Sequence, residues 1–308
     1  MTHHPFRLTA DTAQDATTPH DMKAGRRAFI GALGLGMAGA AIMAGGATPA
    51  AAQSASGLTD TDILNFALNF EYLGAEFYLR ASVGQGLSDN EVGGNTALGP
   101  LGPVAGGRQV GFATNFIRNF ANELAVDERG HVNTLRSALG SNAIARPAID
   151  LSNAFTLAAR AAGLAGPNDT FDAFANENNF LLSAFIFEDV CVTALAGAAP
   201  LLKDKNILST AAGFLAVESY QAGAIRTILY SRALINQANA ISDARDSVDG
   251  ASDDDQGITL NGTPNLTPTD ANGLVFARTP QQVLQVAYLN ASRTPSGFFP
   301  NGVNGTIK

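Results

Sequence analysis

The sequence predicts an all-α protein, built as a four-helix bundle with a long crossover between helices 2 and 3 and a loop-rich C-terminal tail. Three observations lead to this prediction. Four segments repeat apolar residues at helical spacing, glycine and proline gather in the linkers between these segments, and no β-rich block competes with the pattern. The linker between the second and third segments is long, which is typical of bundles that contain a crossover connection.

Residues 1–52 are expected to be a twin-arginine export signal and not part of the fold. Arg26 and Arg27 precede a Gly- and Ala-rich apolar run, and Ala50 to Ala52 resemble a small-residue cleavage site. The alternative is a membrane anchor, but the run is short and weakly apolar for a span, which needs ~20 strongly apolar residues. We therefore expect a periplasmic or secreted protein, with its signal cleaved near Ala52 and no membrane span after cleavage.

Charge and cysteine content narrow the function classes. The net charge is −8, and an acidic chain is a poor candidate for binding nucleic acid or anionic membranes. Cys191 is the single cysteine, so an intramolecular disulfide is excluded. Stability must therefore come from burial of an apolar core, for which the chain is long enough.

The first two helices are predicted from Thr59 to about Val83 and from about Arg108 to Leu139. Thr59 or Asp60 can cap the first helix, and Gly140 ends the second. In each helix a mostly apolar stripe falls on one face. The stripe positions are Leu64, Ala67, Leu68, Glu71, Ala75 and Tyr78 in the first helix, and Ile117, Phe120, Leu124, Glu128, His131 and Leu135 in the second.

The third helix is predicted from about Phe174 to Ala199, where Pro200 stops it. The fourth is predicted from about Lys205 to Asn239, and a short helical piece around Leu151 to Arg160 lies in the crossover. We assign residues 53–241 to the bundle. The stripes are Leu181, Ala184, Glu188, Cys191 and Leu195 in the third helix, and Phe214, Glu218, Gln221, Ile225 and Ile228 in the fourth.

Residues 242–308 form a tail that we expect to pack on the bundle. The stretch RTPQQVLQVAYLN predicts one more helix, capped by Thr279 with Pro280 in its first turn. Five aspartates precede it, which raises the alternative of a calcium site. Their spacing does not match a calcium-binding loop, so we expect a solvated turn. These aspartates are Asp246, Asp249, Asp253, Asp254 and Asp255.

Each of the four apolar stripes is interrupted by one glutamate. Four desolvated carboxylates in one core would be costly and would repel one another, and the stripes hold no Lys or Arg to neutralise them. Two divalent cations would balance four carboxylates, and hard oxygen ligands suit iron or manganese. The sequence therefore predicts a site for two iron ions, or manganese, at Glu71, Glu128, Glu188 and Glu218.

His131 is the one histidine outside the export signal. Since it follows Glu128 by three residues, both side chains point to the same side of the second helix. Carboxylate-bridged dimetal bundles take one Glu from each of two helices and Glu-x-x-His from the other two. Glu218 begins the matching motif on the fourth helix, where Gln221 stands in place of the expected histidine.

The stretches LNFALNFEYLGAEFY, NELAVDERGHVNTLR, FIFEDVCVTALAGAAP and LAVESYQAGAIR resemble the ferritin-like family that includes plant desiccation-related proteins and exported bacterial proteins. This resemblance implies a ferritin-like bundle and implies function only loosely. It also implies a dimetal role for the residues that match the family's positions and a weakened metal position at Gln221. Tyr78 resembles the tyrosine near the ferritin centre. The matching residues are Glu71, Glu128, His131, Glu188 and Glu218.

Taken singly, these residues have simpler interpretations. Glu71 could lie at the boundary between core and solvent, and a lone histidine is more often a satisfied core residue. Glu76 and Asp127 are expected to be solvated, although Asp127 is an alternative partner for His131. Cys191 is expected to be a small buried core residue, with a soft metal ligand as the alternative.

Three functions remain open from the sequence. The first is a dimetal protein that binds metal and reacts with dioxygen or peroxide, which would protect the cell envelope from oxidants. The second is a metal-binding or stress protein without turnover, in line with the desiccation-related resemblance. The third is a structural or partner-binding module with a degenerate metal site. The sequence does not decide between enzyme and non-enzyme, and it leaves the oligomeric state open.

Overall fold

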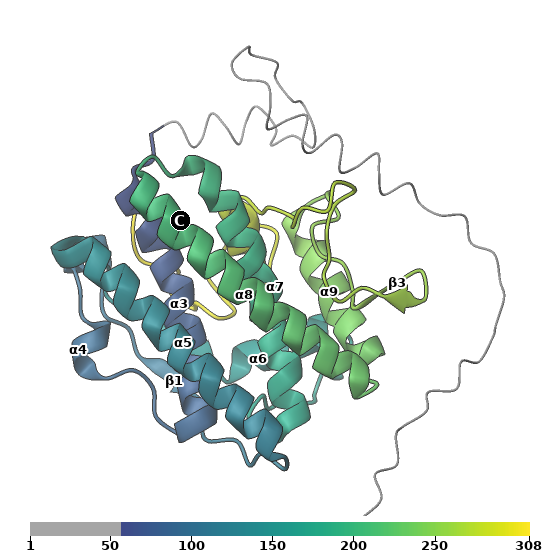
Figure 1. Ribbon diagram of the computed structural model, residues 1–308. Helices are drawn as coiled ribbons and strands as arrows, with labels where there is room; N and C mark the ends of the chain where they lie inside the picture. Colours follow the sequence, from purple (N-terminus) through teal and green to yellow (C-terminus); the bar gives the residue numbers. More distant parts are fainter. Residues whose placement is uncertain (1–56) are drawn as a thin grey trace, which may run out of the picture. The chain divides into compact units, whose positions relative to one another are not determined.

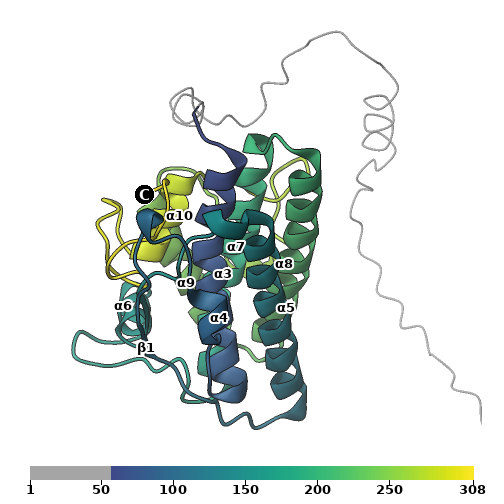
Figure 2. The same ribbon diagram turned by 90° about the vertical axis from the view of Figure 1, so that its left-hand side faces the viewer.

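The computed structural model describes residues 57–308, so the predicted export signal lies outside the described residues. Four long helices run side by side in this part of the chain (Figures 1 and 2). They are α3 (Asp60–Val83), α5 (Asn115–Leu139), α7 (Glu177–Ala198) and α8 (Lys205–Ser231). Helix α3 packs chiefly on α5, and α7 chiefly on α8. The predicted all-α four-helix bundle is confirmed.

Shorter elements cover the bundle. Strands β1 and β2 pair in parallel and join the α3–α5 connection to the α5–α7 crossover, whereas β3 and β4 form a small antiparallel pair. The shorter elements are α4 (Asp89–Val92), η1 (Thr96–Leu98), β1 (Val104–Gly106), η2 (Gly140–Asn142), β2 (Ile149–Leu151), α6 (Asn153–Ala161), η3 (Ala199–Leu201), α9 (Ile235–Asp249), β3 (Thr259–Leu260), β4 (Thr263–Pro264) and α10 (Pro280–Tyr288).

Side-chain caps set where the long helices begin. Of the two candidate caps in the sequence, Thr59 and Asp60, the structure selects Thr59, which forms a capping box with Asp62 at the start of α3. The predicted start of the second helix at Arg108 was wrong, because the chain enters α5 only at the Thr114 cap, whose hydroxyl accepts from the Ile117 amide. Helix α7 likewise begins after the Asn176 cap and not at Phe174.

The predicted end of the fourth helix at Asn239 was also wrong. Helix α8 ends at Ser231, Ala233 takes a left-handed conformation with φ 57°, and α9 then starts at Ile235. This conformation is uncommon for a residue with a Cβ atom. The sequence analysis missed the break because no Gly or Pro stands there to mark it. The break redirects α9 to pack against α6, α7 and α10, and α9 continues past residue 241, where we expected the bundle to end.

The C-terminal segment packs into the core. The ring of Phe298 lies 4.9 Å from that of Phe187 and 5.1 Å from that of Phe155, centroid to centroid. Further along the chain, the Asn304 amide donates to Asn69 Oδ1, and Asn69 Nδ2 donates back to the Asn304 carbonyl, both at 2.9 Å. These contacts hold the chain end against α3.

Two of the aspartates that we expected in a solvated turn are buried, so that expectation was wrong for them. Asp249 is 2% exposed and Asp255 is 6% exposed. Arg278 donates to both, at 2.7 Å and 2.8 Å. Arg226 and Arg245 share Asp189 on α7 at distances of 2.9 Å to 3.0 Å. Buried charges need such partners, and here the partners join the tail to the bundle.

Glu76 was also expected to be solvated, and this was wrong as well. Its side chain is fully buried. Arg80 donates to it at 3.0 Å from the next helical turn, and Arg146 donates to its other oxygen from the crossover. The sequence did not reveal this pairing because Arg146 lies 70 positions further along the chain.

Asp249 gives a pH-dependent prediction. Burial raises the pKa of Asp249 to about 6 against the opposing effect of Arg278, and Asp255 and Asp246 add to the rise. A carboxyl group whose pKa is raised in the folded state contributes most to stability below its unfolded pKa of 3.8. That contribution is lost as the pH rises through about 6.

We therefore expect wild-type stability, measured relative to Asp249→Asn, to fall as the pH rises. Urea unfolding of both proteins between about pH 4 and pH 8 measures this difference. A difference that stays constant or grows with pH would contradict the prediction.

One segment in the described part of the chain, Glu177–Leu201, is long and apolar enough to cross a membrane by length and composition. In the structure 78% of its most apolar window is buried. A core helix of a bundle gives the same signal, since it is apolar on every side.

Candidate metal centre

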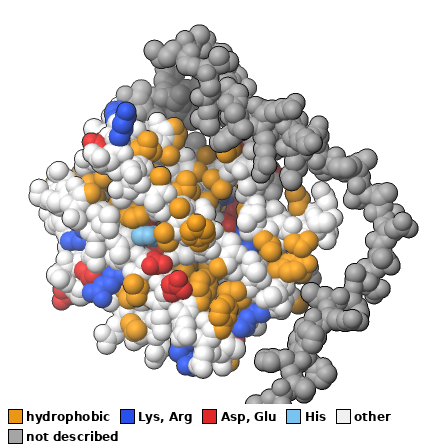
Figure 3. All heavy atoms as spheres, in the orientation of Figure 1, with side chains coloured by type: hydrophobic (Ala, Val, Ile, Leu, Met, Phe, Trp, Pro, Cys, Tyr) orange, Lys and Arg blue, Asp and Glu red, His pale blue; other side chains and the backbone are white. Residues whose placement is uncertain are grey.

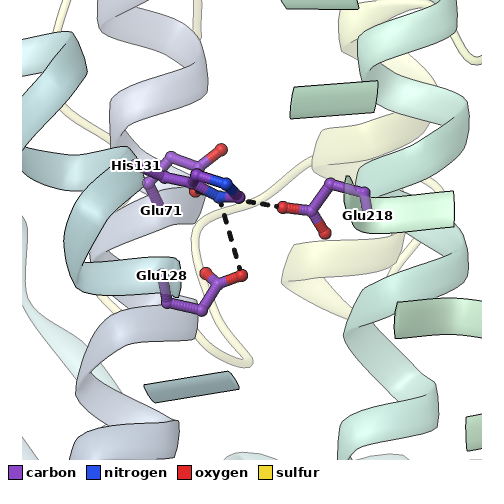
Figure 4. A group of neighbouring side chains, drawn as sticks. All are labelled: Glu71, Glu128, His131 and Glu218. Carbon is purple, nitrogen blue, oxygen red and sulfur yellow. Dashed lines mark ion pairs between the residues drawn. The ribbon is translucent and has the colours of Figure 1, made fainter. Parts of the chain in front are cut away.

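Four of the predicted site residues converge between three of the long helices. Glu71 comes from α3, Glu128 and His131 from α5, and Glu218 from α8 (Figure 4). One ligand atom of each lies within 4.8 Å of the others, and all four side chains are buried. The helical stripes therefore bring residues that are far apart in sequence to one point in the core.

His131 lies at the middle of this group. Its Nδ1 atom is 3.2 Å from Glu71 Oε2, 3.2 Å from Glu218 Oε1 and 3.8 Å from Glu128 Oε1. The imidazole ring of His131 packs on the ring of Phe214, with 4.2 Å between the two ring centroids. The imidazole is thus held with one nitrogen directed at three carboxylates.

Glu188 approaches from α7, the fourth long helix. It is 1% exposed, and its Oε1 atom accepts a hydrogen bond from the Tyr78 hydroxyl on α3. Its Oε2 atom has no hydrogen-bond partner. Glu188 is outside the tight group around His131, although Glu218 is near enough for its charge to raise the pKa of Glu188 after the larger effect of burial.

Gln221 stands one turn after Glu218 on α8 and is buried. Its Nε2 atom donates to Asp127 Oδ2 at 3.2 Å, and its Oε1 atom is buried without a partner. Asp127, which we expected to be solvated, is half-buried and pairs with Gln221. The amide nitrogen is thereby fixed, and the carbonyl oxygen remains available to a ligand.

Several buried polar atoms of these residues make no hydrogen bond. A buried polar atom left without a partner costs about 1–3 kcal/mol, so a ligand that paired with several of these atoms would be strongly stabilised here. Carboxylate and amide oxygens with one imidazole nitrogen fit the donor preferences of iron and manganese. The atoms are Glu71 Oε2, His131 Nδ1, Glu188 Oε2, Glu218 Oε1, Glu218 Oε2 and Gln221 Oε1.

Burial and mutual repulsion change the proton affinities of the group. Burial raises the pKa of Glu71, and it raises the pKa of Glu128 and of Glu188 well above the usual range, with neighbouring carboxylates adding to the rise. Burial alone lowers the pKa of His131, but Glu218 and Glu71 outweigh it and bring the value to about 10. Without a cation the group therefore holds protons, which a cation would displace on binding.

Gly74 on α3 is part of the centre, and the sequence analysis missed it. A Cβ atom at this position would overlap Glu128 Oε2. The absence of a side chain lets the Glu128 carboxylate lie directly against the α3 backbone. A signal was present in the sequence, because a glycine three residues after Glu71 falls on the inward side of an otherwise apolar helix.

Gly74→Ala is expected to weaken metal binding by roughly 10- to 100-fold, the range seen when residues that orient ligands are changed. The added methyl group would displace the Glu128 carboxylate while the helix is preserved. Competition with a metal chelator, followed by elemental analysis, measures the affinity. Gly130→Ala is the matched control, because a Cβ atom there on α5 would meet nothing within 4 Å. Equal affinities for the two variants would remove Gly74 from the centre.

One edge of the group approaches solvent. The side chain of His131 is 8% exposed, and a histidine is visible among hydrophobic side chains on the face shown in Figure 3. His131 is the one histidine among the described residues. His131 is thus the residue of the group that marks its solvent-facing edge.

Cys191 does not join the four residues around His131. The residue is half-buried, although we expected a fully buried core residue. Burial raises the pKa of the Cys191 thiol well above its usual range, as do the charges of Glu218 and Glu188. The raised pKa disfavours the thiolate, which is the form of cysteine that binds metals.

Comparison with known proteins gives three findings. Residues 59–231 match the family model described as ferritin-like domain. The chain is 31% identical over 267 residues to the desiccation-related protein PCC13-62 of Craterostigma plantagineum, which covers 80% of this chain and 83% of that protein. It is 29% identical over 271 residues to the ferritin-like catalase Nec2 of Nesocodon mauritianus, which covers 80% of this chain and 84% of that protein. No solved structure matches the chain significantly.

Proposed function

Because the chain belongs to the ferritin-like domain family, we propose that it binds two metal ions, iron or manganese, between its four long helices. One observation carries this proposal. Glutamates from three of the helices meet His131 in the core, Glu188 from the fourth is near enough for its charge to act on Glu128, and several of their donor atoms have no partner. No Lys or Arg side chain forms an ion pair with Glu71, Glu128, Glu188 or Glu218 in the described part of the chain, so protons or cations must neutralise them.

The residues fall into two sets around such a pair of ions. Glu71, Glu128, His131 and Glu218 would hold one ion, since their ligand atoms already lie within 4.8 Å of one another. Glu188, whose Oε2 atom has no partner, would hold the second ion together with oxygens of the neighbouring glutamates. Gln221 would be a weak additional donor through its unpartnered Oε1 atom.

We propose hydrogen peroxide as the substrate, converted by disproportionation to water and dioxygen. The similar protein from Nesocodon mauritianus is named a ferritin-like catalase, and this reaction uses two peroxide molecules to give two waters and one dioxygen. Bound iron or manganese would supply the redox chemistry that this reaction needs, which is the transfer of two electrons from one peroxide to the other. Peroxide disproportionation in the cell envelope would protect exported proteins from oxidants.

The chain's own residues would orient the ligand. The Tyr78 hydroxyl donates to Glu188 Oε1, which leaves Glu188 Oε2, an atom without a partner, to face the second ion. The pKa of Tyr78 is raised well above its usual range, first by burial and then by the charges of Glu188 and Glu128. Tyr78 thus stays protonated and keeps Glu188 oriented.

A stress-related protein without turnover is the second candidate. Two observations favour it: the similarity to a desiccation-related protein, and Gln221 in place of a second histidine, with its amide tied to Asp127. An amide oxygen is a poorer metal donor than imidazole, so the second position could hold its ion too weakly for sustained turnover. In either case we propose an exported protein, on the basis of the twin-arginine pattern at residues 26 and 27.

The test is to purify the protein without chelator, measure bound metals by elemental analysis, and follow dioxygen release with an electrode after adding peroxide. Metal-loaded protein should release one dioxygen for every two peroxide molecules consumed, and removal of the metal should stop this. Metal binding without dioxygen release would leave the stress protein as the function. Absence of metal, even after anaerobic addition of Fe(II), would overturn both metal-dependent functions.

A further inference from the structure

Two small cavities lie against the metal centre on the side covered by the C-terminal segment. The first, of about 30 Å³, reaches Glu128 and Glu188. The second, of about 40 Å³, reaches Glu71. Phe70 and Cys191 line both cavities, so the two spaces lie on either side of this pair of side chains.

The walls of the cavities are apolar. The first cavity is lined by Leu73, Ile186 and Val190 among others. The second is lined by Ala194 and Val283 among others. Apart from the carboxylates of the centre, the lining of the two cavities contains one charged side chain, that of Arg278 in the second cavity. Its guanidinium is already engaged by Asp249, Thr193 and Asp255.

A water molecule needs two to four polar partners to be held in a buried site, and apolar cavities stay dry and take up apolar atoms instead. The free volume suits a diatomic molecule and is too small for an organic substrate, whose sites measure ~300–1,000 Å³. Away from the carboxylates, the apolar walls offer water and peroxide no hydrogen-bond partner and favour a small apolar gas.

The residues that line the cavities follow α7 away from the metal centre. Cys191, Ala194 and Ala198 lie on one face of α7 and are all partly exposed, which extends the lining from the centre to the end of that helix. Helix α10 covers the other side with Val286 and Val283. Figure 2 shows α10 beside the upper part of α3 and α7. The route thus runs beneath α10 and away from the face where His131 approaches solvent.

We propose that the two cavities bind dioxygen and form its passage between the metal centre and the surface near the end of α7. The role of this passage in turnover rests on the proposed function, in which dioxygen is the product that must leave. Peroxide, which is polar, would use the His131 face. Reactant and product would then take separate routes.

Dissolved dioxygen is itself the probe for this site. Because it is paramagnetic, it increases the relaxation rate of the methyl groups that it contacts, and nuclear magnetic resonance of the metal-free, methyl-labelled protein can detect this. Under dioxygen pressure, with nitrogen as reference, Val190, Val283 and Val286 should relax several-fold faster than under nitrogen. Ile117, which is fully buried on α5 but lines neither cavity, should show a much smaller change.

Filling the cavities should remove the effect. Ala287→Leu narrows the first cavity and should abolish the enhancement at Val190 and Val286. Ala194→Leu narrows the second cavity and should abolish the enhancement at Val283. Ala212→Leu on the exposed side of α8 is the matched control and should leave all of it unchanged. If a filling variant fails to fold, Cys191→Leu serves in its place, since this residue lines both spaces.

The outcomes separate this proposal from the proposed function. An enhancement at the valines no greater than at Ile117, or one that survives filling, overturns the dioxygen site even if the protein decomposes peroxide. An enhancement that is lost on filling establishes the site even if peroxide is not decomposed, because the measurement uses no metal and no turnover. If both hold, the filled variants should retain their bound metal and release dioxygen more slowly.

Discussion

Glu128→Gln is expected to reduce the metal bound by the purified protein from about two ions per chain, as in dimetal bundles, to nearly none. The substitution preserves the volume of the side chain but removes a negatively charged oxygen donor from the group around His131. Elemental analysis and a titration with Fe(II) or Mn(II) measure the loss. A variant that still binds two ions with unchanged affinity would show that Glu128 is not a ligand.

The stability of the metal-free protein distinguishes a ligand from a structural residue. The pKa of Glu128 is raised well above the usual range by burial and by the charges of Glu218 and Glu71, so the ionised form is costly when no metal is bound. Metal-free Glu128→Gln should therefore be at least as stable as metal-free wild type. A structural role predicts the opposite. Glu123→Gln, at an exposed position on the same helix, is the control and should change neither property.

Arg278→Met is expected to lower the free energy of unfolding by about 3–5 kcal/mol, the cost of leaving a buried charge without its partner. The Arg278 side chain is fully buried and donates to Asp249, Asp255 and Thr193. Methionine fills part of the space but donates no hydrogen bond. Asp255 retains Arg245, so most of the loss should arise at Asp249.

Chemical denaturation measures the effect, with Arg293→Met as the control at an exposed position. The control should change stability by less than about 1 kcal/mol, as is usual for exposed charges. Adding Asp249→Asn to Arg278→Met should restore part of the loss, because the carboxylate without a partner is then gone. A loss from Arg278→Met no larger than that of the control would mean that the buried charges do not hold the tail in place.

The parts of the fold that the sequence predicted correctly depend on local patterns. The stripe from Leu64 to Tyr78 shows the inward side of α3, and the Thr59 cap marks its first residue. Glu128 and His131 must share a side of α5 because they are three residues apart. Where the local signal was ambiguous, as between Arg108 and Thr114, the predicted boundary was wrong by several residues.

Long-range contacts explain the expectations that were wrong. Asp249, Asp255 and Glu76 appeared to be solvated because the arginines that neutralise them are not all sequence neighbours. Arg278 follows Asp249 by 29 residues, and Arg146 follows Glu76 by 70. The break at Ala233 has no glycine or proline to signal it, since the packing of α9 stabilises a conformation that an alanine alone would avoid.

The sequence by itself therefore determined the number of long helices, the side that each turns inward and the residue types available for a metal centre, because helical periodicity is a local property of the chain. Only the tertiary structure decided which of these residues meet. It placed one ligand atom each of Glu71, Glu128, His131 and Glu218 within 4.8 Å of one another. It also oriented Glu188 through a hydrogen bond from the Tyr78 hydroxyl and set Gly74 against the Glu128 carboxylate. Such placements depend on how helices pack across the core, and a one-residue shift along a helix rotates a side chain by about 100°.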